Sequence, residues 1–179
     1  MTRVPNSVSV VNVKRNTEQV VVFAIGEDSF AISAAAIQEI RNTDSLGGLV
    51  MDLASALVPK VRHIIERDSK SYYVVSGFEH FRLPPSRPTT VLVLANTPTA
   101  LLVDRIEEMS EMRTLVSLPR SFQGKERIWY RGLTILNGKV VPVVDPKGLL
   151  TTDELRGLAQ RTAEQHETAE PVHSGGKLL

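Results

Sequence analysis

The sequence contains no cysteine among its 179 residues. This absence excludes disulfide bonds, iron–sulfur clusters and zinc sites built on thiolates, and it is typical of proteins from a reducing compartment. Aromatic residues are also few, nine in total, and the formal net charge is only +1. A charge this close to balance argues against a nucleic-acid groove and against a polybasic membrane anchor.

Long apolar runs are missing as well. No stretch approaches the roughly 20 residues that a membrane helix needs, and residues 1–16 have neither the apolar core nor the cleavage site of a signal peptide. With 42% hydrophobic and 23% charged residues, the composition is ordinary for a globular protein. We therefore expect a soluble, cytoplasmic protein with one domain or two closely joined lobes.

The motifs of common catalytic and cofactor sites do not occur. There is no glycine-rich phosphate loop, no Gly-x-Ser-x-Gly and no His-Glu-x-x-His. None of the four histidines has a partner at metal-ligand spacing. We expect no metal, no other cofactor and no catalytic residue at His63, His80, His166 or His173.

What the sequence does contain is a series of short β signals separated by turns. Segments rich in valine, isoleucine and tyrosine alternate with clusters of Gly, Asn, Asp, Ser and Pro. A short helical turn is expected over 33–36, and the proline-rich stretch 82–88 predicts a stiff connector. The predicted strands cover 18–25, 30–32, 37–41, 63–67, 72–75, 91–95, 100–104 and the hairpin 132–145.

Two features of the last hairpin are specific. Asn137-Gly138 predicts a type I′ turn, because both residues tolerate a positive φ. Pro142 in the second strand predicts a sheet edge or a bulge, because proline cannot donate a ladder hydrogen bond. Between this hairpin and the previous one we expect a connector over 110–123.

Helical signals are sparse. Apolar residues over 49–57 recur at helical spacing and stop at Pro59. Thr151 and Glu154 resemble a capping box that opens a short C-terminal helix, although Gly157 weakens it, and we expect disorder from His166 onward. The whole pattern predicts a mainly β protein, with barrels or a sandwich rather than a parallel sheet.

An acidic cluster is the best candidate for chemistry. Asp104, Glu107, Glu108 and Glu111 would share a face if this segment were a helix, and a small hydrolase or transferase could use such carboxylates. Paired carboxylates need burial to separate their pKa values, which nothing in the sequence predicts. A solvated acidic loop is the simpler interpretation.

Two further motifs have simple structural interpretations. Trp129 and Tyr130 are adjacent, so in a strand they would point to opposite faces, with one in the core and one half-exposed. They could also anchor an interface. Residues 85–88 match the minimal Pro-x-x-Pro ligand pattern, but a connector explains them equally well.

Alternate side chains of the predicted strand 37–41 share a face, so Ile37, Glu39 and Arg41 should lie together. The simpler interpretation is a surface ion pair between Glu39 and Arg41, worth less than about 1 kcal/mol. The alternative is a polar patch beside an exposed isoleucine, Ile37 or Ile40, that docks a partner protein. Spacing alone does not decide between them.

A family resemblance adds to these observations. The segment VVVFAIGEDSFAISAAAIQEIR resembles the first segment of the CheW-type coupling proteins of bacterial chemotaxis. The hairpin VLVLANTPTALLVDRIEEM and the segment WYRGLTILNGKVVPVVDPKGLL are similar to later segments of that family, in the same order. The central family string, Gly-x-x-Asn-Leu-Arg-Gly followed by Val-Val-Pro-Val-x-Asp-Leu, is replaced by HIIERDSKSYYVVSG, in which Arg67 stands at the arginine position.

The resemblance implies a fold and an organisation. The fold would be two small SH3-like five-stranded β-barrel lobes with a short internal helix and a C-terminal helix. We expect a flexible arm over 1–16, a CheW-like domain over 17–152, and a short helix with a disordered tail over 153–179.

The resemblance also implies a function. A non-enzymatic adaptor would couple the cytoplasmic tip of a chemoreceptor to a CheA-type histidine kinase, with no nucleic acid and no membrane insertion. The implied receptor-groove residues are Ile37, Glu39, Ile40, Arg41 and Arg67. The candidate kinase-side residues are Gly132, Leu133 and Leu136.

Other functions stay open at this point. The altered central string suits a specialised CheW-like protein of a motility or pilus pathway that binds only one partner. A small hydrolase that uses the acids at 104–111 belongs to a different class. A nucleic-acid-binding barrel is a further option, although the near-zero charge and few aromatic residues count against it.

Overall fold

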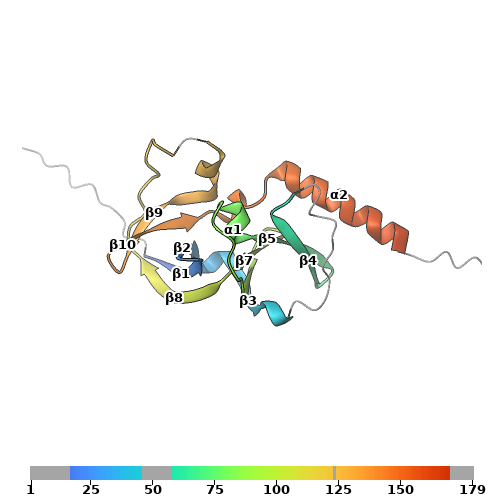
Figure 1. The fold of residues 1–179 in the computed structure, drawn as a ribbon, viewed down its shortest axis with the longest axis horizontal. Helices are drawn as coiled ribbons and strands as arrows, with labels where there is room; N and C mark the ends of the chain where they lie inside the picture. The colour runs from blue at the N-terminus through green and yellow to red at the C-terminus, as the bar shows by residue number, and fades with distance from the viewer. Residues whose placement is uncertain (1–16, 46–57, 123, 170–179) are drawn as a thin grey trace, which may run out of the picture.

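The computed structural model of the chain describes residues 17–45, 58–122 and 124–169. Ten strands in this part of the chain form two five-stranded sheets, which lie side by side as two lobes (Figure 1). The helix predicted over 49–57 lies outside the described residues. The mainly β class and the two five-stranded lobes predicted from the sequence are confirmed.

Lobe 1 combines the beginning and the end of the domain. Its strand order is β8-β1-β2-β10-β9, with one parallel neighbour pair, β2 and β10. The strands are β1 (Glu18–Ile25), β2 (Asp28–Ser33), β8 (Arg105–Met112), β9 (Tyr130–Leu136) and β10 (Lys139–Val144).

Lobe 2 is built from the middle of the chain. Its strand order is β3-β6-β7-β5-β4, and the parallel neighbours are β5 and β7. The strands are β3 (Ile37–Asn42), β4 (Val61–Arg67), β5 (Lys70–Ser76), β6 (Thr90–Leu94) and β7 (Thr99–Val103). Within the described residues neither ladder of hydrogen bonds closes, so each lobe is a strongly curved sheet with two edges rather than a complete barrel.

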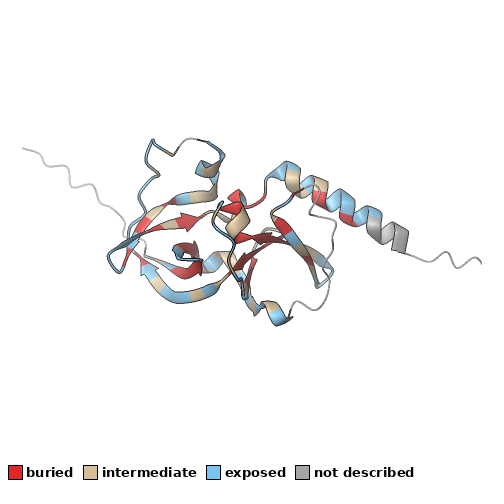
Figure 2. Cartoon of the chain, viewed as in Figure 1, coloured by how far each residue is buried: buried red, intermediate tan, exposed pale blue. Residues whose placement is uncertain are grey.

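Alternate residues of a strand point in opposite directions, and strands such as β1 are buried on both sides. In β1, Val20 and Val22 face a small cluster within lobe 1, whereas Val21 and Phe23 face a larger core. This shared core contains residues of both sheets and of the C-terminal helix, and it therefore holds the lobes together (Figure 2). A third cluster lies within lobe 2 and consists of Tyr72, Val74, Val91, Val93, Ala100 and Leu102.

A chain of aromatic contacts crosses the shared core. Phe81 stacks on Phe30 at 4.7 Å and on Tyr130 at 5.8 Å between ring centroids. Trp129 and Tyr130 lie 6.3 Å apart in this same chain. The prediction that they point to opposite faces is wrong, because Trp129 ends a 3-10 helix (Lys125–Trp129) and only Tyr130 belongs to a strand.

Several predicted local features are confirmed. Asn137 and Gly138 have φ angles of 49° and 77°, as a type I′ turn requires. The expected register shift is present beside Pro142, between Val143 and Val144, although β10 is an internal strand.

The segment around Ser110 differs from the prediction. The connector expected from Ser110 onward starts later, because β8 continues to Met112 and pairs with β1. An edge strand leaves many side chains in water, so its sequence can be as polar as that of a loop.

The helices are also longer or differently placed than expected. The short internal helix within the described residues is α1 (Gly77–His80), after β5. The C-terminal helix α2 (Thr152–Ala169) has 18 residues, so the disorder expected from His166 is contradicted up to Ala169. The capping box is formed: Thr151 N–H donates to Glu154, and Glu154 N–H donates to the Thr151 hydroxyl at 3.2 Å.

A charged seam in lobe 2 as the candidate functional site

A β-bulge in β3 decides where the predicted docking residues point. The register of β3 against β6 shifts between Ile37 and Glu39. Before the shift, Ile37 packs against the shared core. After it, Glu39 and Arg41 lie opposite Val93 and Val91, which belong to the lobe-2 cluster. The prediction that Ile37, Glu39 and Arg41 share one face is therefore wrong for Ile37.

Glu39 joins the two edges of the lobe-2 sheet. Its carboxylate accepts a hydrogen bond from Arg41 Nε at 2.8 Å on the same strand, and it forms an ion pair with Arg67 on β4. β3 and β4 are at opposite ends of the strand order, with a strand on one side only among the described residues. We call the gap between β3 and β4, with these three side chains, the lobe-2 seam.

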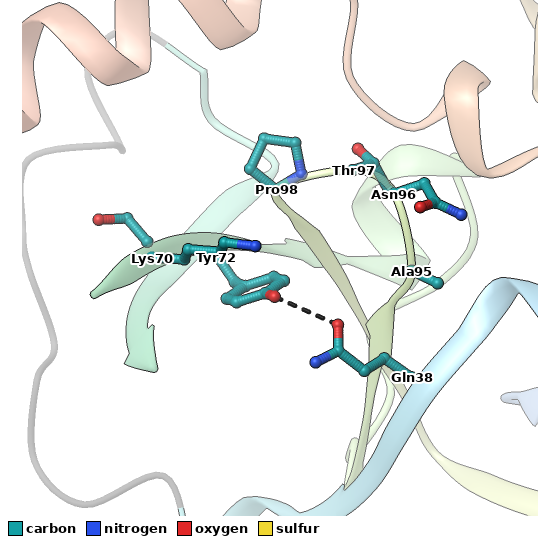
Figure 3. Close-up of a pocket in the computed structure, with 8 residues that line it drawn as sticks. Gln38, Lys70, Tyr72, Ala95, Asn96, Thr97 and Pro98 are labelled. Atoms are coloured by element: carbon teal, nitrogen blue, oxygen red, sulfur yellow. Dashed lines mark hydrogen bonds between the residues drawn. The ribbon is translucent and has the colours of Figure 1, made fainter. Parts of the chain in front are cut away.

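A second contact crosses the same gap. The Tyr72 hydroxyl on β5 donates to Gln38 Oε1 at 3.2 Å, as Figure 3 shows. Beside this bond lies a surface hollow of about 600 Å³, whose lining includes Lys70, Asn96 and Pro98. The lobe-2 sheet is thus closed by side chains where its backbone ladder stops.

The seam is half-buried, and side chains of both charges meet in it. The side chains of Glu39, Arg41 and Arg67 are 28%, 29% and 34% exposed, so water screens the ion pairs only partly. The Glu39 carboxylate pairs with both guanidinium groups, and Arg67 Nε also lies 3.5 Å from the exposed carboxylate of Asp68. Loss of Glu39 would leave the two arginines with only this exposed carboxylate, and removal of one partner is the costly way to break a partly buried pair.

Lobe 1 has a comparable seam that sequence reasoning missed. Arg131 on β9 forms a two-pronged ion pair with Glu18 on β1, at 2.7 and 3.0 Å. The hydrogen bond from Arg131 holds the pKa of the Glu18 carboxyl below its usual value. Asn137 closes the other end of the gap by donating to Glu108 on β8 at 2.8 Å. These contacts join segments distant in the sequence, so no local pattern could have revealed them.

The structure divides the five predicted receptor-groove residues into two groups. Glu39, Arg41 and Arg67 meet at the lobe-2 seam. Ile37 and Ile40 face the other way: Ile37 is partly buried against the shared core, and Ile40 is 48% exposed. Ile40 is thus a large apolar side chain in water on the strand that carries Glu39.

The candidate kinase-side residues also separate. Gly132 is buried, and a Cβ there would lie 2.4 Å from the Val116 carbonyl oxygen. Leu136 is buried in the lobe-1 cluster. Leu133 is half-buried, and of the three it is the residue whose side chain alternates toward the outer face of β9.

The acidic cluster does not form a catalytic site. The segment 105–112 is a strand, so the helical face that would gather the four acids does not exist. Asp104 accepts hydrogen bonds from Gly26 N–H and Ser86 at 2.7 Å, and Glu107 accepts one from Ser29 at 2.8 Å. These acids stabilise turns and strand edges rather than converging on a substrate.

Among the described residues, no group of three or more His, Asp or Glu side chains could hold a metal ion. His80 is buried against Trp129, with ring centroids 4.6 Å apart. Burial lowers its pKa to about 3, and the charge of Lys60 acts in the same direction. In the same part of the chain, none of the helices combines the length and the apolarity needed to cross a bilayer.

Comparisons with known proteins agree with this architecture. The model of the CheW-like domain family matches residues 19–154. A solved structure that resembles this one is that of the scaffolding protein TtCheW from Thermoanaerobacter tengcongensis, with a TM-score of 0.62 and 12% sequence identity. The match covers 75% of this chain and 94% of that chain, and at such low identity it shows the shared fold. A search of curated proteins gives no match.

The family is one of non-enzymatic scaffolds of chemotaxis signalling, in agreement with the catalytic motifs missing from the sequence. The family model spans both lobes and the seam between β3 and β4. The chain described here therefore belongs to the CheW-like domain family.

Proposed function

We propose that this chain is an adaptor that binds a chemoreceptor tip and a CheA-type histidine kinase at the same time. The observation that carries the proposal is the Glu39–Arg67 ion pair, which is present although the central family string around Arg67 has diverged. The family membership over residues 19–154 supports the scaffold role. Both partners would place the chain in the cytoplasm, with 17–152 as the domain that binds them and with the C-terminal helix, whose Leu158 packs in the shared core, as its support.

The receptor side would be β3 and the lobe-2 seam. Ile40 supplies an exposed apolar anchor, and buried apolar anchors provide most of the affinity in protein interfaces. Glu39, Arg41 and Arg67 supply charges that select the partner and set its orientation. Ile37 supports β3 from the shared core rather than touching the receptor directly.

Signal transfer requires that one site respond to the other. A receptor whose two states contact β3 differently would bias the position of a kinase bound elsewhere on the same adaptor. By the same coupling, kinase binding would change the affinity of the adaptor for the receptor. The shared core suits this role, because it is one continuous set of packed side chains from both lobes.

The test is a two-way pull-down with a receptor cytoplasmic fragment and a CheA-type kinase. Glu39→Lys should abolish receptor binding, because it reverses the charge between two arginines. Glu27→Lys is the matched control, since Glu27 is exposed in the β1–β2 turn. Circular dichroism should show that both variants are folded.

A second variant separates docking from folding. In Glu39→Lys/Arg67→Glu the ion pair across the seam is restored with reversed polarity. We expect the double variant to regain stability but not receptor binding. Receptor binding by Glu39→Lys at the level of the unmodified chain would show that the proposed surface is wrong.

A one-partner version of the adaptor is the second candidate. The string HIIERDSKSYYVVSG, which forms β4 and β5, departs from the family pattern on the proposed receptor side. This departure favours a specialised motility or pilus pathway in which the kinase contact is retained and the receptor contact is lost. Kinase binding without receptor binding in the same pull-down would select it.

A further inference from the structure

The segment RLPPSRP, between α1 and β6, lies at the boundary of the two lobes. We call it the proline connector; its residues are 82–88. Leu83 packs against the shared core, and the Ser86 hydroxyl donates to Asp104 Oδ1 at 2.7 Å. Asp104 itself joins β7 of lobe 2 to β8 of lobe 1. The proline connector is therefore fixed to both lobes in its first half and in its middle.

The backbone of the connector is also held at both ends. Leu83 N–H donates to the Phe78 carbonyl oxygen at 2.8 Å, and Thr89 N–H donates to that of Val103 at 3.1 Å. Residues 83–89 belong to no helix or strand. Proline fixes φ near −65°, and a residue that precedes proline avoids the helical region. With three prolines between its two anchors, the connector favours the extended polyproline II conformation.

This conformation decides which side chains face outward. Polyproline II has three residues per turn, so residues three apart lie on one edge. Leu83 and Ser86 share the edge that faces the protein. Pro85 and Pro88 share a second edge, on which Pro85 is exposed and Pro88 is half-buried. The two prolines therefore present one apolar edge to the solvent.

The rest of the connector adds positive charge beside that edge. Pro84 and Arg87 share the third edge, and both are exposed. At the start of the connector, the exposed guanidinium of Arg82 lies over the Trp129 ring, 5.7 Å from its centroid. Among the described residues, neither arginine forms an ion pair with an acidic side chain. A complementary partner would place carboxylates beside an apolar groove.

The combination is that of a docking segment. Proline-rich segments in polyproline II bind grooves lined by aromatic side chains, and they lose little conformational entropy on binding because the helix is preformed. Here the anchors at Leu83, Ser86 and Thr89 hold the segment in place before any partner arrives, which lowers the cost of binding further. A stiff connector alone would not require two arginines without acidic partners beside the prolines.

We propose that the proline connector docks a protein module of the SH3 type, with an aromatic-lined groove and acidic side chains beside it. The aromatic rings would receive Pro85 and Pro88, and the carboxylates would pair with Arg82 and Arg87. The module would be a further partner, in addition to the receptor and the kinase. This inference does not rest on the proposed adaptor function.

The proposal is tested by isothermal titration calorimetry of the full chain with a panel of purified SH3 domains that bind Pro-x-x-Pro segments flanked by arginine. At least one domain should bind, with one domain per chain. Pro85→Ala should weaken this binding by about tenfold or more, as expected for an anchor of the contact. The matched control is Pro98→Ala, because Pro98 is an exposed proline between β6 and β7, outside the connector. The control should change the affinity less than about twofold.

A charge reversal tests the second part of the contact. Arg87→Glu should weaken binding of the same domain and reduce its dependence on salt, because it replaces an attraction to carboxylates by a repulsion. Arg113→Glu is the control, since the Arg113 side chain is 76% exposed on another segment. Pro85 and Arg87 are exposed, so circular dichroism and thermal unfolding should show that both variants are folded.

Each contrary outcome identifies what fails. If no domain of the panel binds the unmodified chain, or if Pro85→Ala binds as tightly as the unmodified chain, the proposal is overturned. It is also overturned if Pro85→Ala loses the receptor fragment or the kinase, because the connector would then belong to one of those surfaces. If the chain binds the SH3 domain through Pro85 but binds neither the receptor fragment nor the kinase, the adaptor function is wrong and this inference stands.

Discussion

Glu39 on β3 and Arg67 on β4 form an ion pair across the two edges of one sheet. This ion pair links the two edge strands through side chains, at a place where no ladder of backbone hydrogen bonds joins them. A residue that the sequence presented as either a surface charge or a docking residue therefore has a structural role as well.

The first prediction concerns the energy of this pair. A double-mutant cycle with Glu39→Gln and Arg67→Met should give a coupling free energy of about 1 kcal/mol, because the side chains are half-buried. Urea denaturation followed by the fluorescence of the single tryptophan measures it. The Glu111–Arg113 pair, in which Arg113 is 76% exposed, is the control and should give a coupling near zero. Equal couplings would mean that the seam is no more than a surface contact.

The second prediction concerns the close approach at Gly132. Gly132→Ala should lower the free energy of unfolding by about 1–3 kcal/mol, because the new methyl group would overlap the Val116 carbonyl oxygen. Urea denaturation again provides the measurement. An unchanged midpoint would show that the segment at Val116 can move away freely.

The third prediction concerns a glycine without such a neighbour. A Cβ at Gly157 in α2 would meet nothing within 4 Å. Gly157→Ala should therefore raise the free energy of unfolding by up to about 1 kcal/mol, since alanine loses less backbone entropy in a helix. A lower melting temperature in differential scanning calorimetry would contradict the placement of this helix.

The fourth prediction concerns acid. Because burial lowers the pKa of His80 to about 3, its unfolded form binds a proton near pH 6.5 and its folded form does not. The unfolded state thus gains protons first, so stability should fall as the pH drops from about 6.5 toward 3, by an amount on the order of 4 kcal/mol.

His80→Phe isolates this effect, because a ring is kept and the titration is removed. Its stability should decline less steeply between pH 6.5 and 4 than that of the unmodified chain. Trp129 is 4.6 Å from His80 and reports unfolding directly by fluorescence. If the free energy of unfolding fell equally steeply with pH in both proteins, the low pKa assigned to His80 would be contradicted.

Local chemistry could be predicted from the sequence. The Asn137-Gly138 turn and the Thr151–Glu154 capping box depend on residues a few positions apart, and both are formed. The valine-rich strands were recognisable for the same reason, since alternation and β-branching are properties of short segments.

Relationships between distant segments could not be predicted. The bulge at Gln38 depends on how β3 aligns with β6, and it moves Ile37 away from Glu39. The strand β8 has a polar sequence and exists because it pairs with β1. The sequence of β9 and β10 does not show which of their apolar side chains face water. Ile135 and Val140 are exposed because the alternating residues, such as Leu136 and Val141, pack in the lobe-1 cluster. The family resemblance, and not spacing, places Glu39 and Arg67 in one groove, and the ion pair between them is found in the structure.

The central claim is that one chain holds two proteins at once. Size-exclusion chromatography with light scattering, on the chain mixed with the receptor fragment and the kinase, tests it most directly. We predict a single complex whose mass includes all three components, with the receptor fragment lost when Glu39→Lys is used. Mutually exclusive binding, in which the receptor fragment displaces the kinase, would contradict the account.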